Sequence, residues 1–267
     1  MLEYIIILAV LLFIAVLFYK QANEQFEILQ IDAERLSDLP TVYQDRSPIV
    51  VSGFPTPTLG TESELQKRDH IMQMQTKGIS LRSLLASPAL QTFTFPKASA
   101  EFLCKESGLN IWFEHHLYKS LLPSPYTSWI YSFNTSLWPD HRGLFKTTAF
   151  QTLLMPTQGT AIVTLMLPTM IPYLPTKWGG RLFSSLTMQD TPLLNQLQFI
   201  EIKIRKGNLL LLPAHLIANI HSETKVSEKA SERGSETKAS EKASERGSEN
   251  NAWIFIAEIH HPISRLA

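Results

Sequence analysis

The sequence predicts a mainly β domain with flanking helices, placed behind one N-terminal transmembrane helix. Two observations carry this prediction: an uncharged apolar run at the N-terminus, and five short apolar or alternating segments in the second half of the chain. A chain of 267 residues with a short anchor is long enough for one sizeable core, so a second domain is not required.

Residues 2–19 are expected to form the anchor. Tyr4 to Tyr19 carry no charge, and an 18-residue helix reaches about 27 Å, just enough for a thin hydrocarbon core. The rival interpretation is a cleaved signal peptide, which favours a basic start and a small-residue cleavage site, whereas Glu3 precedes this run and FYKQANEQF follows it. We therefore expect a single-pass membrane protein.

The side of the membrane stays open. Lys20 follows the anchor and favours a cytosolic domain under the positive-inside rule. Asn134-Thr135-Ser136 is an acceptor triplet for N-glycosylation and would favour a lumenal one.

The first half of the chain mixes helix and strand signals. Residues 20–47 form an expected helical lead-in, with a short helix at 32–36 that ends before Pro40. The β-branched run Pro48–Gly53 predicts a buried strand that opens a β domain over 48–267. Apolar spacing predicts helix within 62–87, and 93–96 is expected to be extended.

The second half predicts strands separated by Gly, Pro and Asn. In Phe199–Arg205, three isoleucines share one face and the charged residues share the other. Such short segments favour a barrel or sandwich. The five predicted strands are 160–167, 199–205, 209–212, 216–220 and 252–259.

Residues 222–250 hold a tandem repeat. SETKVSEKASERG is followed by SETKASEKASERG, and each copy offers little beyond Ala to bury. We expect a low-complexity, solvated loop inserted between two strands.

Charge and motifs exclude several classes of function. The 24 basic and 24 acidic residues balance, so nucleic-acid binding is not expected. Cys104 is the single cysteine, which excludes an internal disulfide and a cysteine metal cluster. The sequence contains no nucleophile elbow, phosphate loop or dinucleotide fingerprint. The aromatic stretch Trp112–Trp138 is compatible with a pocket lining but is more typical of core.

Two motifs resemble the JmjC and cupin-like family of Fe(II)/2-oxoglutarate oxygenases. One is the proline-led strand that ends in glycine, within Arg46–Gly53, and the other is the late turn Gly207–Pro213 that leads into a strand. The resemblance implies a double-stranded β-helix, a cupin- or jelly-roll-like barrel. It also implies iron held by His-x-Asp/Glu and a distant His.

The ligand positions implied by this resemblance carry other residues. Counting back from Gly159 places the first ligand pair at Phe145 and Thr147, and counting on from Gly207 places the distal His at Ala218. The lysine expected to pair with the cosubstrate falls near Ala161. We therefore expect a degenerate metal site, no catalytic residues, and no cofactor.

Histidines elsewhere are the alternative ligands. His141 follows Asp140, and an extended Asp-His pair would point its side chains in opposite directions unless a loop brings them together. His215 in LPAHL is the second substitute, and His221-Ser222-Glu223 is the one His-x-Glu in the sequence. The adjacent pairs 115–116 and 260–261 are weaker candidates.

Three functions stay open at this point. The favoured one is a membrane-anchored, catalytically inactive cupin-like pseudoenzyme with a binding or structural role toward a protein partner or small ligand. The second is an active Fe(II)/2-oxoglutarate-dependent hydroxylase that uses His141 or His215. The third is an assembly component whose anchor is its main functional feature.

Overall fold

The computed structural model describes residues 27–39, 47–87, 90, 93–122, 129–190, 193–223 and 252–261, together with Tyr4, Ile7, Val10, Leu11, Phe13 and Ile14. Within these residues we find no helix with the length and apolar character that a bilayer crossing requires. Most of the predicted anchor at 2–19, and the repeat at 222–250 apart from Ser222 and Glu223, lie outside the described residues.

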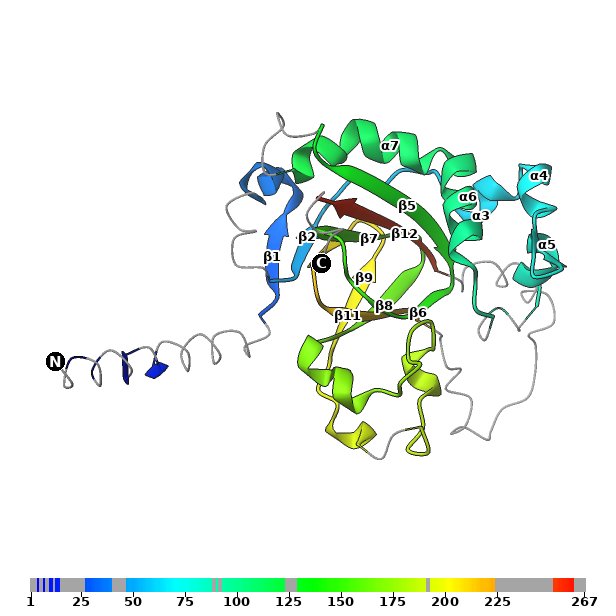
Figure 1. Cartoon of the computed structure of the whole chain (residues 1–267). Coiled ribbons are helices and arrows are strands. Elements are labelled where there is room, and N and C mark those ends of the chain that lie inside the picture. The colour runs from blue at the N-terminus through cyan, green and yellow to red at the C-terminus, as the bar shows by residue number, and fades with distance from the viewer. Residues whose placement is uncertain are drawn as a thin grey trace, which may run out of the picture.

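Two antiparallel sheets build the domain, with one parallel strand added at an edge (Figure 1). The six-stranded sheet has the order β1-β2-β10-β7-β12-β5 and the four-stranded sheet the order β6-β11-β8-β9. The strands are β1 (Leu29–Asp32), β2 (Ile49–Ser52), β5 (Ser132–Pro139), β6 (His141–Lys146), β7 (Gln151–Gln158), β8 (Thr160–Met166), β9 (Ile200–Arg205), β10 (Leu209–Pro213), β11 (Ile217–Ser222) and β12 (Trp253–His260).

The chain from β5 to β12 follows the path of a jelly roll. β5, β7, β10 and β12 lie in one sheet, and β6, β8, β9 and β11 lie in the other, so the chain passes repeatedly between the two. Eight antiparallel strands shared in this way form a double-sheet jelly roll, the architecture of cupins. The fold is therefore mainly β and cupin-like, as the sequence predicts.

The connections define two ends of the barrel. We call the end at which β1 begins the proximal end and the opposite end the distal end. At the proximal end β12 also ends, and short turns join β6 to β7 and β10 to β11. At the distal end tight turns join β5 to β6, β7 to β8 and β9 to β10. Two long insertions interrupt this pattern: residues 167–199 leave from the proximal end, and residues 223–252 leave from the distal end.

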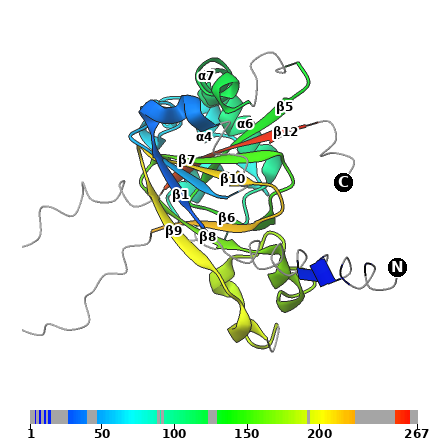
Figure 2. The same cartoon turned by 90° about the vertical axis from the view of Figure 1, so that its left-hand side faces the viewer.

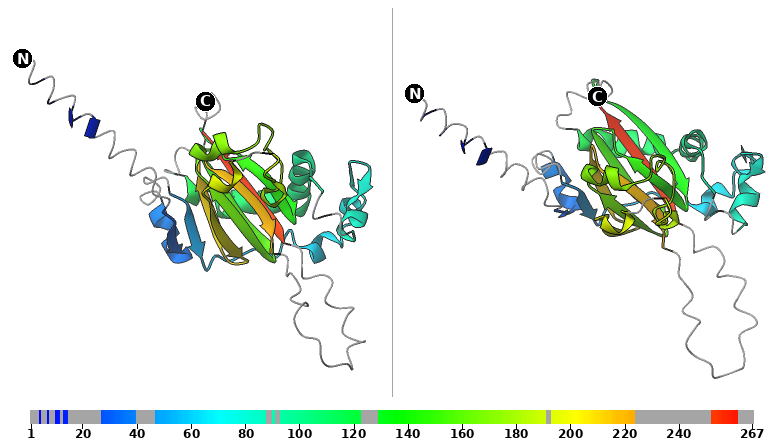
Figure 3. Two further views of the ribbon diagram at one scale, coloured as in Figure 1. Left: turned by 90° about the horizontal axis from the view of Figure 1, so that it is seen from below. Right: turned by 60° about the horizontal axis from the view of Figure 1, so that its bottom comes forward.

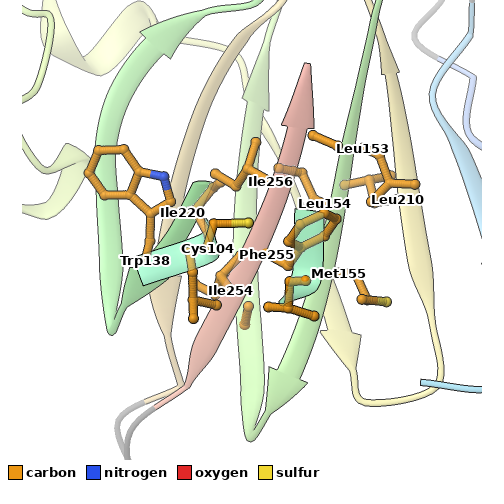
Figure 4. Close-up of a cluster of buried hydrophobic side chains, with 14 of the residues drawn as sticks. Cys104, Trp138, Leu153, Leu154, Met155, Leu210, Ile220, Ile254, Phe255 and Ile256 are labelled. Carbon is orange, nitrogen blue, oxygen red and sulfur yellow. The ribbon is translucent and has the colours of Figure 1, made fainter. Parts of the chain in front are cut away.

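Helices cover the outer face of the six-stranded sheet. In Figure 1, α6 (Lys97–Ser107) and α7 (Leu109–His116) lie over β5, and Phe113 of α7 meets Phe255 of β12 with ring centroids 5.8 Å apart. Because side chains alternate along β12, Ile254 and Ile256 face away from these helices. Both sets belong to one buried cluster, part of which is shown in Figure 4.

Smaller elements precede these helices. The 62–87 segment contains the helical turns that its apolar spacing predicts, and a two-stranded hairpin interrupts them. These elements are α3 (Glu62–Leu65), α4 (Asp69–Met72), β3 (Gln75–Thr76), β4 (Ile79–Ser80) and α5 (Leu81–Leu85). After α7 comes the 3-10 helix η4 (Tyr118–Leu121).

The five strands predicted in the second half are confirmed within a residue or two of their predicted ends, and so is the strand at 48–53. The segment 93–96 pairs with no strand, and its last residue, Pro96, has the expected extended backbone (φ −69°, ψ 142°) where it caps α6. The lead-in differs as well: β1 pairs in parallel with β2 before the 3-10 helix η1 (Ala33–Asp38), so the sheet begins by Leu29 and not at residue 48.

The 167–199 insertion covers the outer face of the four-stranded sheet (Figures 2 and 3). It contains the 3-10 helices η6 (Pro168–Tyr173), η7 (Phe183–Ser185) and η8 (Leu194–Gln196). Leu174, Leu186 and Leu197 of the insertion form a second buried cluster with three residues of the sheet, Leu144, Met166 and Ile217. The insertion also pairs with edge strand β6: Leu144 N–H donates to Arg181 O (2.7 Å), and Gly180 N–H donates to Leu144 O (2.7 Å).

Gly143 permits this close pairing, because a Cβ there would lie 2.3 Å from Gly180 O. We expect Gly143→Ala to lower the free energy of unfolding by about 1–3 kcal/mol, since backbone atoms must shift to admit the methyl group. Urea unfolding measures this change. Gly179→Ala is the matched control, because a Cβ at Gly179 meets nothing within 4 Å. Equal stability of the two variants would contradict the packing.

Asp140 holds both ends of the 223–252 insertion. Its N–H donates to Ala252 O (2.8 Å), and its carboxylate accepts a hydrogen bond from Ser222 Oγ. Asp140 has a left-handed backbone (φ 64°), which Asp tolerates better than most residues. The ends of the insertion are therefore fixed to the same residue.

Fixed ends predict that the intervening chain is dispensable for folding. Replacing residues 224–251 by a Gly/Ser linker of about six residues shortens the closed loop by roughly two doublings, which favours folding by about 1 kcal/mol. We expect the shortened chain to match or slightly exceed the wild type in thermal unfolding. A large loss of stability would show that the repeat contributes to the fold.

Candidate functional site

The ligand positions implied by the resemblance come together at the proximal end. Phe145 of β6 lies directly opposite Ala218 of β11, and both belong to or pack against the same buried cluster. Thr147 follows β6 and lies beside the turn that leads into β11. The two motif strands of the resemblance are also neighbours, because β2 pairs with β10 and Phe54 N–H donates to Gly207 O (2.8 Å).

Thr147 is fully committed to the backbone of the β10–β11 turn. Its buried hydroxyl donates toward Pro213 O (2.8 Å) and accepts from Leu216 N–H (2.9 Å). Its own N–H donates to Leu216 O (2.8 Å), and its carbonyl accepts from His215 N–H (2.7 Å). The Thr147 oxygen therefore closes a turn, which is a structural task.

Phe145 serves as a platform for a cation. The Arg142 guanidinium lies 3.6 Å from the centroid of the Phe145 ring and 5.2 Å from that of Trp138. Such contacts contribute about 0.5–2 kcal/mol each, more when desolvated. Ala218 is completely buried and presents only a methyl group.

These three residues do not fit Fe(II). Iron in this class of site needs two imidazoles and a carboxylate with open positions, whereas the chain offers a phenyl ring, a methyl group and a hydroxyl that is already hydrogen-bonded. Across the part of the chain that the structure describes, no three His, Cys, Asp or Glu side chains are grouped to hold a metal ion.

The two substitute histidines lie at opposite ends of the barrel. His215 is exposed in the proximal turn before β11, with a left-handed backbone (φ 75°). His141 begins β6 at the distal end, opposite His221 of β11. His215 is hydrogen-bonded to Thr147 through its N–H. Thr147 lies six positions after His141 along extended chain, a distance of roughly 20 Å. The two histidines are therefore not partners for one ion.

Asp140 and His141 do converge, as a turn between two strands allows. Asp140 Oδ2 lies 3.1 Å from His141 Nδ1 in a buried setting. Burial alone would raise the pKa of Asp140, but hydrogen bonds from His141 and Ser222 outweigh it and hold the pKa below its usual value. Burial lowers the pKa of neighbouring His221. Because the Ser222 hydroxyl donates to the carboxylate and not to an imidazole, this is not the arrangement of a serine nucleophile and its base.

A buried ion pair between the two sheets is the feature that the sequence analysis missed. Arg142 Nη2 of β6 donates to Glu258 Oε1 of β12 (3.1 Å), and Lys97 Nζ of α6 donates to Glu258 Oε2 (3.3 Å). The Arg142 and Glu258 side chains are only 13% and 15% exposed. The signal available was the one charge within the apolar run AWIFIAEI. Burial alone would raise the pKa of Glu258, but Arg142 and Lys97 lower it below its ordinary range.

Glu258→Gln should lower the free energy of unfolding by roughly 3 kcal/mol near neutral pH, because it leaves Arg142 buried beside a neutral group. Since the folded pKa of Glu258 is lowered, its stabilisation is complete above the unfolded carboxyl pKa of about 4.3 and is lost as pH falls through the folded value. Urea unfolding as a function of pH should therefore show a shallower acid dependence in the variant. The double variant Arg142→Met/Glu258→Gln is the control, and its free energy of unfolding should fall less than that of Glu258→Gln. A larger fall would show that the unpaired Arg142 charge is not the cause of the destabilisation.

The remaining candidates are dispersed. Cys104 is buried in the core, and burial raises the pKa of its thiol to about 12, which excludes a ready nucleophile. His115 and His116 end α7, with the His116 ring stacked on Trp112, whereas His260 and His261 lie at the end of β12. Ala161 is completely buried in β8, and Asn134 is exposed on edge strand β5.

Comparisons with known proteins find the fold at low similarity. No family model matches the sequence, and no curated protein matches it. Hydroquinone 1,2-dioxygenase from Sphingomonas sp. TTNP3, solved with 4-hydroxybenzoate bound, is 14% identical with a TM-score of 0.27, covering 50% of this chain and 61% of that one. A cupin superfamily protein from Desulfitobacterium hafniense DCB-2 is 12% identical with a TM-score of 0.24, covering 48% and 67%.

Drosophila melanogaster CENP-C bound to CAL1 is 7% identical with a TM-score of 0.23, covering 46% of this chain and 62% of that one. The chain thus spans about three fifths to two thirds of the length of these three structures. Similarity at this level does not bear on function, and the cupin-like fold rests on the strand order.

Proposed function

We propose that this chain is a membrane-anchored cupin-like protein without iron or 2-oxoglutarate chemistry, a pseudoenzyme whose barrel has a binding or structural role toward a protein partner. The observation that carries the proposal is the set of backbone hydrogen bonds made by Thr147. A position that would hold a metal ligand in an oxygenase of the resembled family instead ties two strands together.

The interior beside this position supports the same proposal. The Arg142 guanidinium lies over the rings of Phe145 and Trp138, and Arg142 is neutralised by Glu258 from the opposite sheet. A cation and an aromatic ring thus occupy the place where an oxygenase needs open coordination positions. Arg142 spans the two sheets and stiffens the barrel, which suits a scaffold.

The proposed anchor is supported by the described residues of the N-terminal segment. Tyr4, Ile7, Val10, Leu11, Phe13 and Ile14 are helical and exposed, from 42% at Ile14 to 77% at Tyr4. Large apolar side chains that are left uncovered by the protein itself mark surfaces that contact lipid or another protein.

Metal and cosubstrate binding by the full chain in detergent tests the proposal. We expect no stoichiometric iron by elemental analysis after loading with Fe(II), and no heat of 2-oxoglutarate binding by calorimetry. Stoichiometric iron with cosubstrate affinity would instead support the hydroxylase alternative, and its loss in His215→Ala or His141→Ala would identify the histidine responsible.

A designed variant provides the positive control. Phe145→His/Ala218→His places two imidazoles on directly opposite residues, close enough to chelate one ion. Adding Co(II) at about 100 times its dissociation constant should stabilise this variant by about 2.7 kcal/mol in thermal unfolding. Phe145→His alone is the matched control and should respond far less.

A further inference from the structure

The 167–199 insertion has an unusual composition for a surface segment. Its 33 residues contain only three charges, Lys177, Arg181 and Asp190. Arg181 and Asp190 neutralise each other in a two-pronged ion pair with N···O distances of 2.8 and 3.1 Å. Lys177 is thus the one charge of the insertion that no other charge of the insertion offsets.

Part of this apolar content is buried, but part is exposed. Nine of its apolar residues belong to the second buried cluster or pack against it: three are buried in it and six are partly buried against it. Met188, Leu193 and Phe199 are 60%, 43% and 45% exposed. Large apolar side chains that stay exposed can mark a surface that contacts lipid or another protein.

The insertion leaves the barrel at the end where the chain arrives from the N-terminal segment. Met166 ends β8 and Ile200 begins β9 at the proximal end, and Leu29 begins β1 at that same end. Residues 20–28 separate Leu29 from the apolar run, a tether that reaches at most roughly 30 Å. An anchored chain therefore holds its proximal end within a short distance of the bilayer.

We propose that the exposed apolar residues of the insertion, Met188, Leu193 and Phe199, form a second membrane contact that rests on the lipid surface. This inference rests on the membrane anchor of the proposed function. The apolar side chains enter the interfacial region, and Lys177 extends toward lipid phosphates. The proximal end of the barrel then faces the bilayer, and the distal end, where Glu223 and Ala252 lie, faces away from it.

Site-specific fluorescence on the full chain in phosphatidylcholine vesicles tests this orientation. Met188→Cys and Leu193→Cys carry an environment-sensitive nitrobenzoxadiazole label, while buried Cys104 stays unlabelled. Lys206→Cys is the matched control, exposed in the distal turn between β9 and β10. We expect blue-shifted emission at 188 and 193, and quenching by spin-labelled lipid several times stronger than at 206.

Vesicle flotation separates this inference from the proposed anchor. A chain that fails to float with the vesicles overturns the anchor and the contact together. A chain that floats, with labels at 188 and 193 as water-exposed and unquenched as the label at 206, overturns the membrane contact alone. Blue-shifted labels that spin-labelled lipid does not quench also overturn it, and indicate that the surface is covered by a second copy of the chain.

Discussion

The contact between Thr147 and the β10–β11 turn is the constraint on which the proximal end of this barrel depends. The Thr147 side chain and backbone form hydrogen bonds with the N–H and C=O of Leu216 and with the N–H of His215. His215 itself adopts a left-handed conformation that a non-glycine residue rarely takes. These bonds fix where β11 starts, and so fix Ala218 opposite Phe145. The same atoms cannot both close this turn and serve as a metal site.

A buried ion pair lies inside the barrel beside Phe145, one of the ligand positions that the resemblance implies. Arg142 and Glu258 come from opposite sheets and meet with little exposure, so each depends on the other to offset its desolvation. The Arg142 guanidinium also lies over the aromatic rings of Phe145 and Trp138. Phe145, at an expected ligand position, therefore contributes to cohesion between the sheets.

How well the sequence predicts each strand depends on how that strand is buried and on whether it contains Gly or Pro. The strands from β8 onward show alternation or short apolar runs bounded by turn residues, and their limits are predictable. β7 is buried along nearly its whole length and contains Pro156, and β6 contains Gly143, so neither shows a clear strand pattern. Counting from the motif glycines gives Phe145 and Ala218 only as ligand positions that the resemblance implies, and their pairing across β6 and β11 is seen in the structure. The contact of Arg142 with Glu258 joins residues 116 positions apart, and no local pattern encodes it.

The two insertions divide the molecule into ends with different physical character. The 167–199 insertion is nearly uncharged and leaves the proximal end, whereas the 223–252 insertion is dense in Glu, Lys and Arg and leaves the distal end, where Asp140 holds its limits. This polarity agrees with the membrane-anchored arrangement that we propose, because apolar surface is stabilised near lipid and alternating charge is stabilised in water.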